Sequence, residues 1–141
     1  RSYPKRTTII GERLELMAGT HEGRVIVFPQ LTEVLTPFET KPQAKKLLDA
    51  DGGSITLMEL AGGQSWHEHH SVHPVIVQVL KGKVDYSAKG QSIILEPGKI
   101  IHTTAKLLHS VTALEDSTLM VIMLTGESHP EPNITIEVEQ V

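Results

Sequence analysis

The chain has 141 residues, the size of one ordinary domain, and it contains no cysteine, which excludes disulfides, thiolate catalysis, iron–sulfur clusters and cysteine-based zinc sites. Its 13 Lys and Arg residues against 17 Asp and Glu residues give a net charge of -4. That balance offers no basic face and argues against nucleic acid as a partner.

Glycine-containing turns punctuate the chain, and short β-branched runs lie between them. Many short strands with regularly spaced turns indicate an all-β sandwich or barrel. In the N-terminal part, Glu12–Met17 and Gly23–Phe28 are expected strands outside the central set. The segment Lys41–Ala50 matches helical spacing, but it would also serve as a strand that ends in a turn, so both alternatives stay open.

The central part of the chain contains the runs from which a barrel would be built. In chain order, the expected strands are Ser54–Leu60, Pro74–Leu80, Lys83–Ala88, Gln91–Leu95, Lys99–Thr103, Ser110–Leu114 and Thr118–Leu124. Two of the connections between them, "LKGK" and "AKGQ", are short enough to be hairpin turns.

The longest apolar run, Leu119–Leu124, is far too short to span a bilayer. No charged-then-apolar signal segment opens the chain, so we expect a cytoplasmic protein with no membrane partner. At the C-terminal end, Ile134–Val138 alternates as a strand does. Extra strands at both ends can cover the open edges of a small barrel or pair with a second copy, and we therefore expect a homodimer.

Four histidines fall within residues 67–73, directly before an apolar run. His67 and His69 are two residues apart on an expected strand, so both imidazoles would project from one face while Glu68 points the opposite way. Two imidazoles aimed at one point make half of a metal site, and His109 is the best candidate for a third ligand. Imidazole suits Zn, Ni, Cu and Fe, and three protein ligands leave a position open for water or substrate.

The residues around these histidines resemble the first motif of the cupin family, G-x5-H-x-H-x3/4-E-x6-G. The stretch "AGGQSWHEHHSVHPVIVQVLKG" carries the H-x-H at His67 and His69 and the closing glycine at Gly82. Ala61 occupies the place of the leading glycine.

The second cupin motif, G-x5-P-x-G-x2-H-x3-N, is matched by "GKIIHTTAKLLHSVTA" at Gly98 and His109. The proline, glycine and asparagine of the motif are replaced by Thr104, Lys106 and Ala113. The resemblance covers residues 54–124. Over this range the sequence is similar to the sequences of small single-domain bacterial cupins of unassigned function.

The resemblance implies a cupin-type jelly-roll β-barrel with extra N- and C-terminal strands. Residues 1–141 would form a single cupin domain. Its core barrel would span residues 44–125, preceded by an N-terminal arm of residues 1–43 and followed by a C-terminal strand in residues 126–141.

The glutamate of the first motif is absent from this chain. Counting forward from His69, its place falls on His73 or Pro74, and counting back from Gly82, it falls on Val75. The loop is therefore one residue longer than in the standard motif.

The ligand set that the resemblance implies is one metal held by His67, His69, a carboxylate and His109. With the glutamate missing, His73 is the nearest replacement in this chain, and Gln78 is the alternative. The metal would be a divalent transition metal, with Zn, Ni, Fe, Mn and Cu all open.

The resemblance also implies a barrel cavity that binds a small molecule. Its wall is expected to come from Val75, Val77, Val79, Ile101 and Met120, or from their strand neighbours. With a bound metal, the protein would be a metal-dependent dioxygenase or isomerase, although the sequence offers no obvious general base. The alternative is a non-enzymatic cupin that binds or senses a small molecule with a degenerate or empty metal site.

Overall fold

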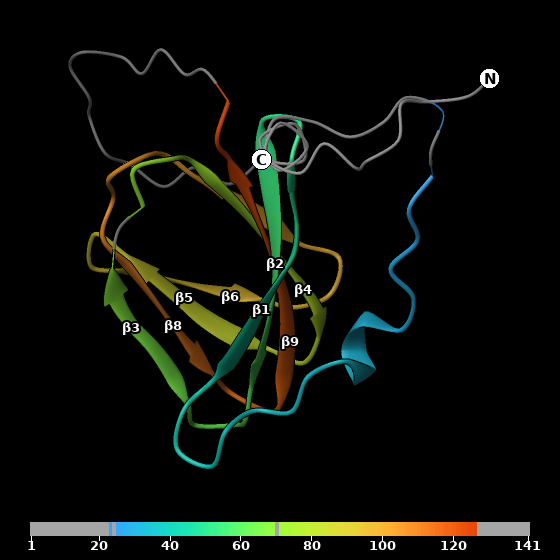
Figure 1. Cartoon of the computed structure of the whole chain (residues 1–141). Helices are drawn as coiled ribbons and strands as arrows, with labels where there is room; N and C mark the ends of the chain where they lie inside the picture. The colour runs from blue at the N-terminus through green and yellow to red at the C-terminus, as the bar shows by residue number, and fades with distance from the viewer. Residues whose placement is uncertain (1–22, 24, 70, 127–141) are drawn as a thin grey trace.

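The computed structural model describes residue 23, residues 25–69 and residues 71–126, with the backbone alone for Glu68 and His69. In this part of the chain, two antiparallel sheets face each other and enclose the core between them (Figure 1). The expected all-β architecture is confirmed, because the described elements are nine strands and one short 3-10 helix.

The described elements are short strands and one 3-10 helix. They are η1 (Leu31–Glu33), β1 (Gln43–Ala50), β2 (Gly53–Leu60), β3 (Ser65–His69), β4 (Val75–Lys81), β5 (Val84–Ala88), β6 (Gln91–Leu95), β7 (Ile100–Thr103), β8 (His109–Ala113) and β9 (Ser117–Leu124). One sheet has the strand order β1-β2-β9-β4-β7, and the other has the order β3-β8-β5-β6.

The core lies between the sheets because alternate residues of each strand face inward. On β4, Val75, Val77 and Val79 are buried while their neighbours are half-buried. The same alternation on β5 buries Val84, Tyr86 and Ala88. The remaining members of the buried core are Met58, Leu60, Leu95, Val111, Ala113 and Leu119.

The elements predicted for the N-terminal part of the chain agree with the structure in one segment and differ from it in another. The segment Lys41–Ala50, for which a helix and a strand were both open, contains the strand β1. The strand expected at Gly23–Phe28 is wrong, because residues 25–28 belong to no strand, and Val25 is 90% exposed. A strand needs a neighbouring strand for its backbone hydrogen bonds, and no described strand pairs with residues 25–28. The expected strands at residues 12–17 and 134–138 lie outside the described residues.

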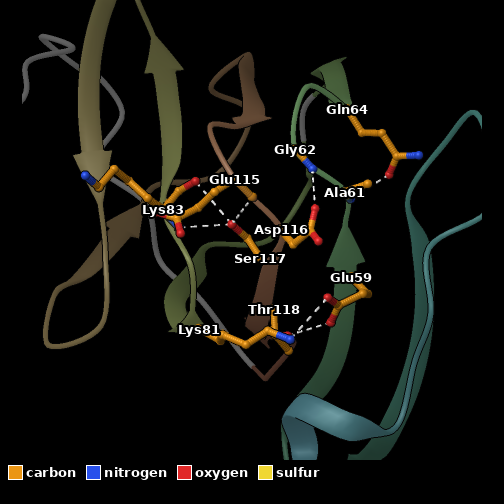
Figure 2. Close-up of polar contacts among 10 residues, drawn as sticks. All are labelled: Glu59, Ala61, Gly62, Gln64, Lys81, Lys83, Glu115, Asp116, Ser117 and Thr118. Carbon is orange, nitrogen blue, oxygen red and sulfur yellow. Dashed lines mark hydrogen bonds and ion pairs between the residues drawn. The ribbon is translucent and has the colours of Figure 1, made fainter.

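One end of the barrel is closed by turns that bind one another (Figure 2). The β8–β9 connection carries Asp116, whose carboxylate accepts a hydrogen bond from the backbone N–H of Gly62 at 2.8 Å. The next residue, Ser117, accepts from the backbone N–H of Lys83 at 3.0 Å. Three connections, β2–β3, β4–β5 and β8–β9, are thereby joined, and the opposite end of the barrel is the one where β3 and β7 finish.

No helix among the described residues is long and apolar enough to cross a membrane.

Candidate functional site

A cavity of about 290 Å³ lies between the two sheets. It is lined by Ala44, Thr56, Met58, Trp66, Ser71, Val75, Val77, Tyr86, His109, Val111, Leu119, Val121 and Met123. Most of these side chains are apolar, and only a few carry a hydroxyl, an indole N–H or an imidazole. Such a concave, mainly apolar space with a few polar groups is the usual form of a small-molecule site.

The strands put these residues on the cavity wall by simple alternation. Val75 and Val77 line it as expected, because both face inward from β4. Met120 does not line the cavity, but its neighbours on β9, Leu119 and Val121, do. Val79 and Ile101, which were also expected on the wall, do not line it, and no residue of β7 does. The expected wall is therefore confirmed only in part, with β9 turned by one residue from the expected register.

His109 is the imidazole on this wall, and it is only 6% exposed. Its Nδ1 lies 2.9 Å from the backbone carbonyl oxygen of Leu107. Because a carbonyl oxygen can only accept, Nδ1 is the donor in this contact, and in the neutral imidazole the lone pair is then on Nε2. The same tautomer is the one in which histidine binds a metal through Nε2.

Tyr86 provides the second buried polar group of the wall. Its hydroxyl and the hydroxyl of Thr103 lie 2.7 Å apart, and both residues are almost fully buried. Burial raises the pKa of the Tyr86 phenol, and the hydrogen bond from Thr103 lowers it by less. The Tyr86 ring also stacks on the imidazole of His109, with centroids 5.3 Å apart. Tyr86 was not singled out as a polar site residue, although its place between Val84 and Ala88 signals an inward-facing position.

The two motif histidines of β3 are separated by an irregularity in the strand. Trp66 pairs with Val111 on β8, but His69 pairs with His109, so β3 holds one residue more than β8 over this stretch. The expectation that His67 and His69 share a face because they are two residues apart does not hold across such a bulge. The His67 side chain is exposed and does not line the cavity.

The backbone register nevertheless brings one motif histidine close to His109. Residues that lie directly opposite in an antiparallel pair point to the same face of the sheet. His69 holds that position relative to His109. The side chain of His69 lies outside the described part of the structure.

Neither candidate for the missing glutamate lines the cavity. His73 is half-buried in the β3–β4 loop, where its backbone N–H donates to Ser71 Oγ at 3.1 Å. Gln78 alternates with the inward-facing Val77 and Val79, so its side chain belongs to the opposite face of the sheet. Over residues 23, 25–67 and 71–126, whose side chains the structure describes, no three histidines or carboxylates gather as a metal-binding group.

The fold and the cavity define the class of the protein, a jelly-roll barrel with an internal pocket, and comparisons with known proteins agree. The model of the cupin domain family matches residues 56–125. This chain belongs to the cupin family. None of the curated proteins matches it.

Many solved structures share the fold. A cupin superfamily protein from Desulfitobacterium hafniense is 20% identical, with 77% of this chain and 96% of that chain covered and a TM-score of 0.63. An RmlC-like cupin from Desulfovibrio desulfuricans is 15% identical, with 73% and 100% covered and a TM-score of 0.66. A conserved protein of unknown function from Streptococcus pyogenes is 19% identical, with 79% and 96% covered and a TM-score of 0.62. At these identities the likeness is one of fold.

Proposed function

We propose that this cupin binds a small molecule in the cavity between its two sheets. The observation that carries the proposal is the cavity itself, which is lined mainly by apolar side chains and also by Tyr86, whose buried hydroxyl is paired with that of Thr103. A space of about 290 Å³ is far larger than one water, and an apolar space of this kind binds apolar molecules in preference to water.

Benzene is a suitable probe for this proposal, because it needs no polar contact. The chain has a single tryptophan, Trp66, which lines the cavity, so its fluorescence reports on the site. We expect benzene to change the Trp66 emission in a saturable way. The variant Val77→Phe, which fills the cavity, should abolish this response, whereas Val72→Phe, at an exposed position that does not line the cavity, should not. An equal response in Val77→Phe and in the unchanged protein would contradict the proposal.

A second candidate function is metal binding, and the pairing of His69 with His109 favours it. His109 has the tautomer that a metal ligand needs, since its Nδ1 is bound to a carbonyl. We propose His69 and His109 as two ligands of a divalent transition metal, Zn, Ni, Fe, Mn or Cu. A bound metal would supply Lewis-acid chemistry, as a dioxygenase or an isomerase of this fold would use it.

Metal content measured on protein purified without a nickel column tests the second candidate. After equilibration with Zn²⁺ and desalting, we expect about one equivalent of metal in the unchanged protein and a loss of most of it in His69→Ala and in His109→Ala. His102 is exposed on β7 and does not line the cavity, so His102→Ala is the matched control. Equal metal content in the control and in the two variants would remove the metal from the proposal and leave the non-enzymatic binder.

We also propose that two copies of the chain associate as a homodimer. The segment before η1 exposes apolar side chains, with Val25 at 90% and Val27 at 73%. Ile26 between them is 42% exposed, and neighbouring exposed apolar side chains are typical of association surfaces. Light scattering should give a dimer mass for the unchanged protein and a monomer mass for Val25→Asp/Val27→Asp. A monomer mass for the unchanged protein would contradict the proposal.

A further inference from the structure

The wall of the cavity limits the charge of a ligand, an inference that rests on the binding function proposed above. Over the residues that the structure describes, no Lys, Arg, Asp or Glu lines the cavity. A charged ligand would lose its hydration there without meeting an opposite charge from these side chains. Burial of an ion under such conditions is strongly unfavourable, so the wall itself selects an uncharged molecule.

The polar atoms on the wall are also too few for a ligand with many hydroxyls. Ser71 Oγ already accepts from the backbone N–H of His73 and donates to the sulfur of Met123 at 3.8 Å. His109 Nδ1 is bound to the Leu107 carbonyl. A sugar, which carries hydroxyls around its whole ring, would leave most of them without a partner in this cavity.

Tyr86 is a polar group of the wall whose hydrogen-bonding capacity exceeds what Thr103 uses. A tyrosine hydroxyl can donate one hydrogen bond and accept others, and Thr103 takes up one of these. Either oxygen of the 2.7 Å pair can be the donor, so Tyr86 can present its proton or a lone pair to a ligand. The stack on His109 fixes the ring, which also fixes the position of the hydroxyl. β5 and β8, which carry the two rings, lie side by side in the same sheet (Figure 1).

The volume of the cavity sets the size of the ligand. A cavity of about 150 Å³ is known to hold benzene. The cavity between the sheets is about 290 Å³, so it accommodates one ring with small alkyl substituents, or a branched chain of similar bulk.

We infer that the cavity accepts an uncharged, mainly apolar molecule of about this size with one hydrogen-bonding oxygen, and that the Tyr86 hydroxyl, held by Thr103, recognises this oxygen. Tyr86 is thereby a specificity-determining residue of the site. The apolar wall supplies the affinity, and the Tyr86 hydroxyl selects among ligands of the same shape.

Four probes of similar size test separately the effects of one hydroxyl, of a negative charge and of many hydroxyls on binding. They are menthol, its hydrocarbon p-menthane, the anion 4-isopropylcyclohexanecarboxylate, and glucose. None of them absorbs where tryptophan is excited, so the Trp66 emission of chelator-treated protein reports binding of each. We expect menthol to bind about three- to tenfold more tightly than p-menthane, which is the usual effect of one hydrogen bond. The carboxylate and glucose should bind at least about a hundredfold more weakly than menthol.

The variant Tyr86→Phe keeps the ring and removes the hydroxyl. It should bind p-menthane as the unchanged protein does and lose the preference for menthol. The matched control is Thr56→Val, which removes another hydroxyl from the cavity wall and should keep the preference. An undiminished preference for menthol in Tyr86→Phe, or its equal loss in Thr56→Val, would overturn the role of Tyr86.

The outcomes also separate this inference from the proposed function. Tight binding of glucose or of the carboxylate to the chelator-treated protein, with a Trp66 response, would leave the binding function intact and overturn the ligand class. Carboxylate binding that arises only after addition of Zn²⁺ would have the same consequence, because the metal and not the wall would then select the ligand. Absence of a response to all four probes and to benzene would contradict the binding function itself.

Discussion

Tyr86 and His109 stack face to face, with ring centroids 5.3 Å apart and ring planes that differ by 13°. They come from neighbouring strands, and the backbone partner of His109 is Ala88, two residues beyond Tyr86. The two rings are therefore diagonal neighbours on the inward face of one sheet. Each ring is also bound at its polar atom, His109 to the Leu107 carbonyl and Tyr86 to Thr103. The position of one ring consequently depends on the other, and both depend on bonds made by the loop and strand beside them.

The first prediction concerns the buried hydroxyl pair. Tyr86→Phe leaves the Thr103 hydroxyl buried without its partner, and we expect the free energy of unfolding to fall by about 1–2 kcal/mol. Thr103→Val should lower the free energy of unfolding by a similar amount, because it leaves the buried Tyr86 hydroxyl without its partner. In the double variant both polar groups are gone, so its loss in the free energy of unfolding should be clearly smaller than the sum of the losses in the two single variants. Urea unfolding of the four proteins measures this, and strict additivity would show that the two hydroxyls do not depend on each other.

The second prediction concerns alkaline pH. The pKa of Tyr86 is raised above 10.0 by burial, so the folded protein holds the phenol proton more tightly than the unfolded chain does. Its contribution to stability is complete below pH 10 and is lost as the pH rises through the higher pKa of the folded state. We expect the free energy of unfolding to fall more steeply above pH 10 in the unchanged protein than in Tyr86→Phe. The chain has one other tyrosine, and Tyr3→Phe is the control. A pH dependence that is the same in all three proteins would contradict the prediction.

The fold followed from the sequence because its main signals are local. Runs of β-branched residues between glycine turns predict strands whatever their partners, and the central set was found within one or two residues. Lys106 is a departure from the motif that keeps a backbone conformation typical of glycine. It stands at the place of a motif glycine, and it adopts the left-handed φ of 65° that the glycine would have allowed.

The site was harder to predict because it depends on register between distant strands. The spacing of His67 and His69 predicts a shared face only if β3 is regular, and the pairing with β8 that introduces the bulge cannot be read from β3 alone. Tyr86 and Thr103 are 17 residues apart on different sheets, so no local pattern joins them. Alternation predicted the part of the cavity wall that β4 supplies through Val75 and Val77, whereas it predicted neither the remaining wall residues nor the polar contacts between strands.

The third prediction concerns a buried carboxylate on the five-stranded sheet. Glu59 is only 4% exposed and accepts a hydrogen bond from the Thr118 hydroxyl at 2.5 Å, while Lys81 lies 3.9 Å away (Figure 2). Glu59→Ala leaves the fully buried Thr118 hydroxyl without its acceptor, and we expect a loss of about 2 kcal/mol. Lys81→Met should cost less than about 1 kcal/mol, because the lysine side chain is half exposed.

Glu59→Gln separates the hydrogen bond from the charge, because an amide oxygen can still accept from Thr118. Thermal unfolding of the three variants should rank Lys81→Met and Glu59→Gln close to the unchanged protein and Glu59→Ala well below it. If Lys81→Met were as destabilising as Glu59→Ala, the ion pair and not the hydrogen bond would be the main contribution.

The last prediction concerns the closing glycine of the first motif. Gly82 has a φ of +91°, and a Cβ at this position would overlap the carbonyl oxygen of Asp116 and the Cα and hydroxyl of Ser117. Gly90 is a matched control, since its φ of +73° is also positive but no atom lies within 4 Å of an added Cβ. Gly90→Ala should therefore cost only the left-handed strain, about 1–2 kcal/mol.

Gly82→Ala adds a clash with backbone that three connections hold in place, and we expect it to cost about 3 kcal/mol or more. Urea unfolding of both variants measures the difference. The neighbouring hydroxyl can be removed separately, because Ser117→Ala relieves one of the overlapping atoms while the Asp116 carbonyl stays. Gly82→Ala should consequently destabilise the protein more than Gly90→Ala does, even when Ser117→Ala removes the overlapping hydroxyl. Equal costs for Gly82→Ala and Gly90→Ala would mean that the positive φ, and not the close approach of the β8–β9 connection, requires glycine here.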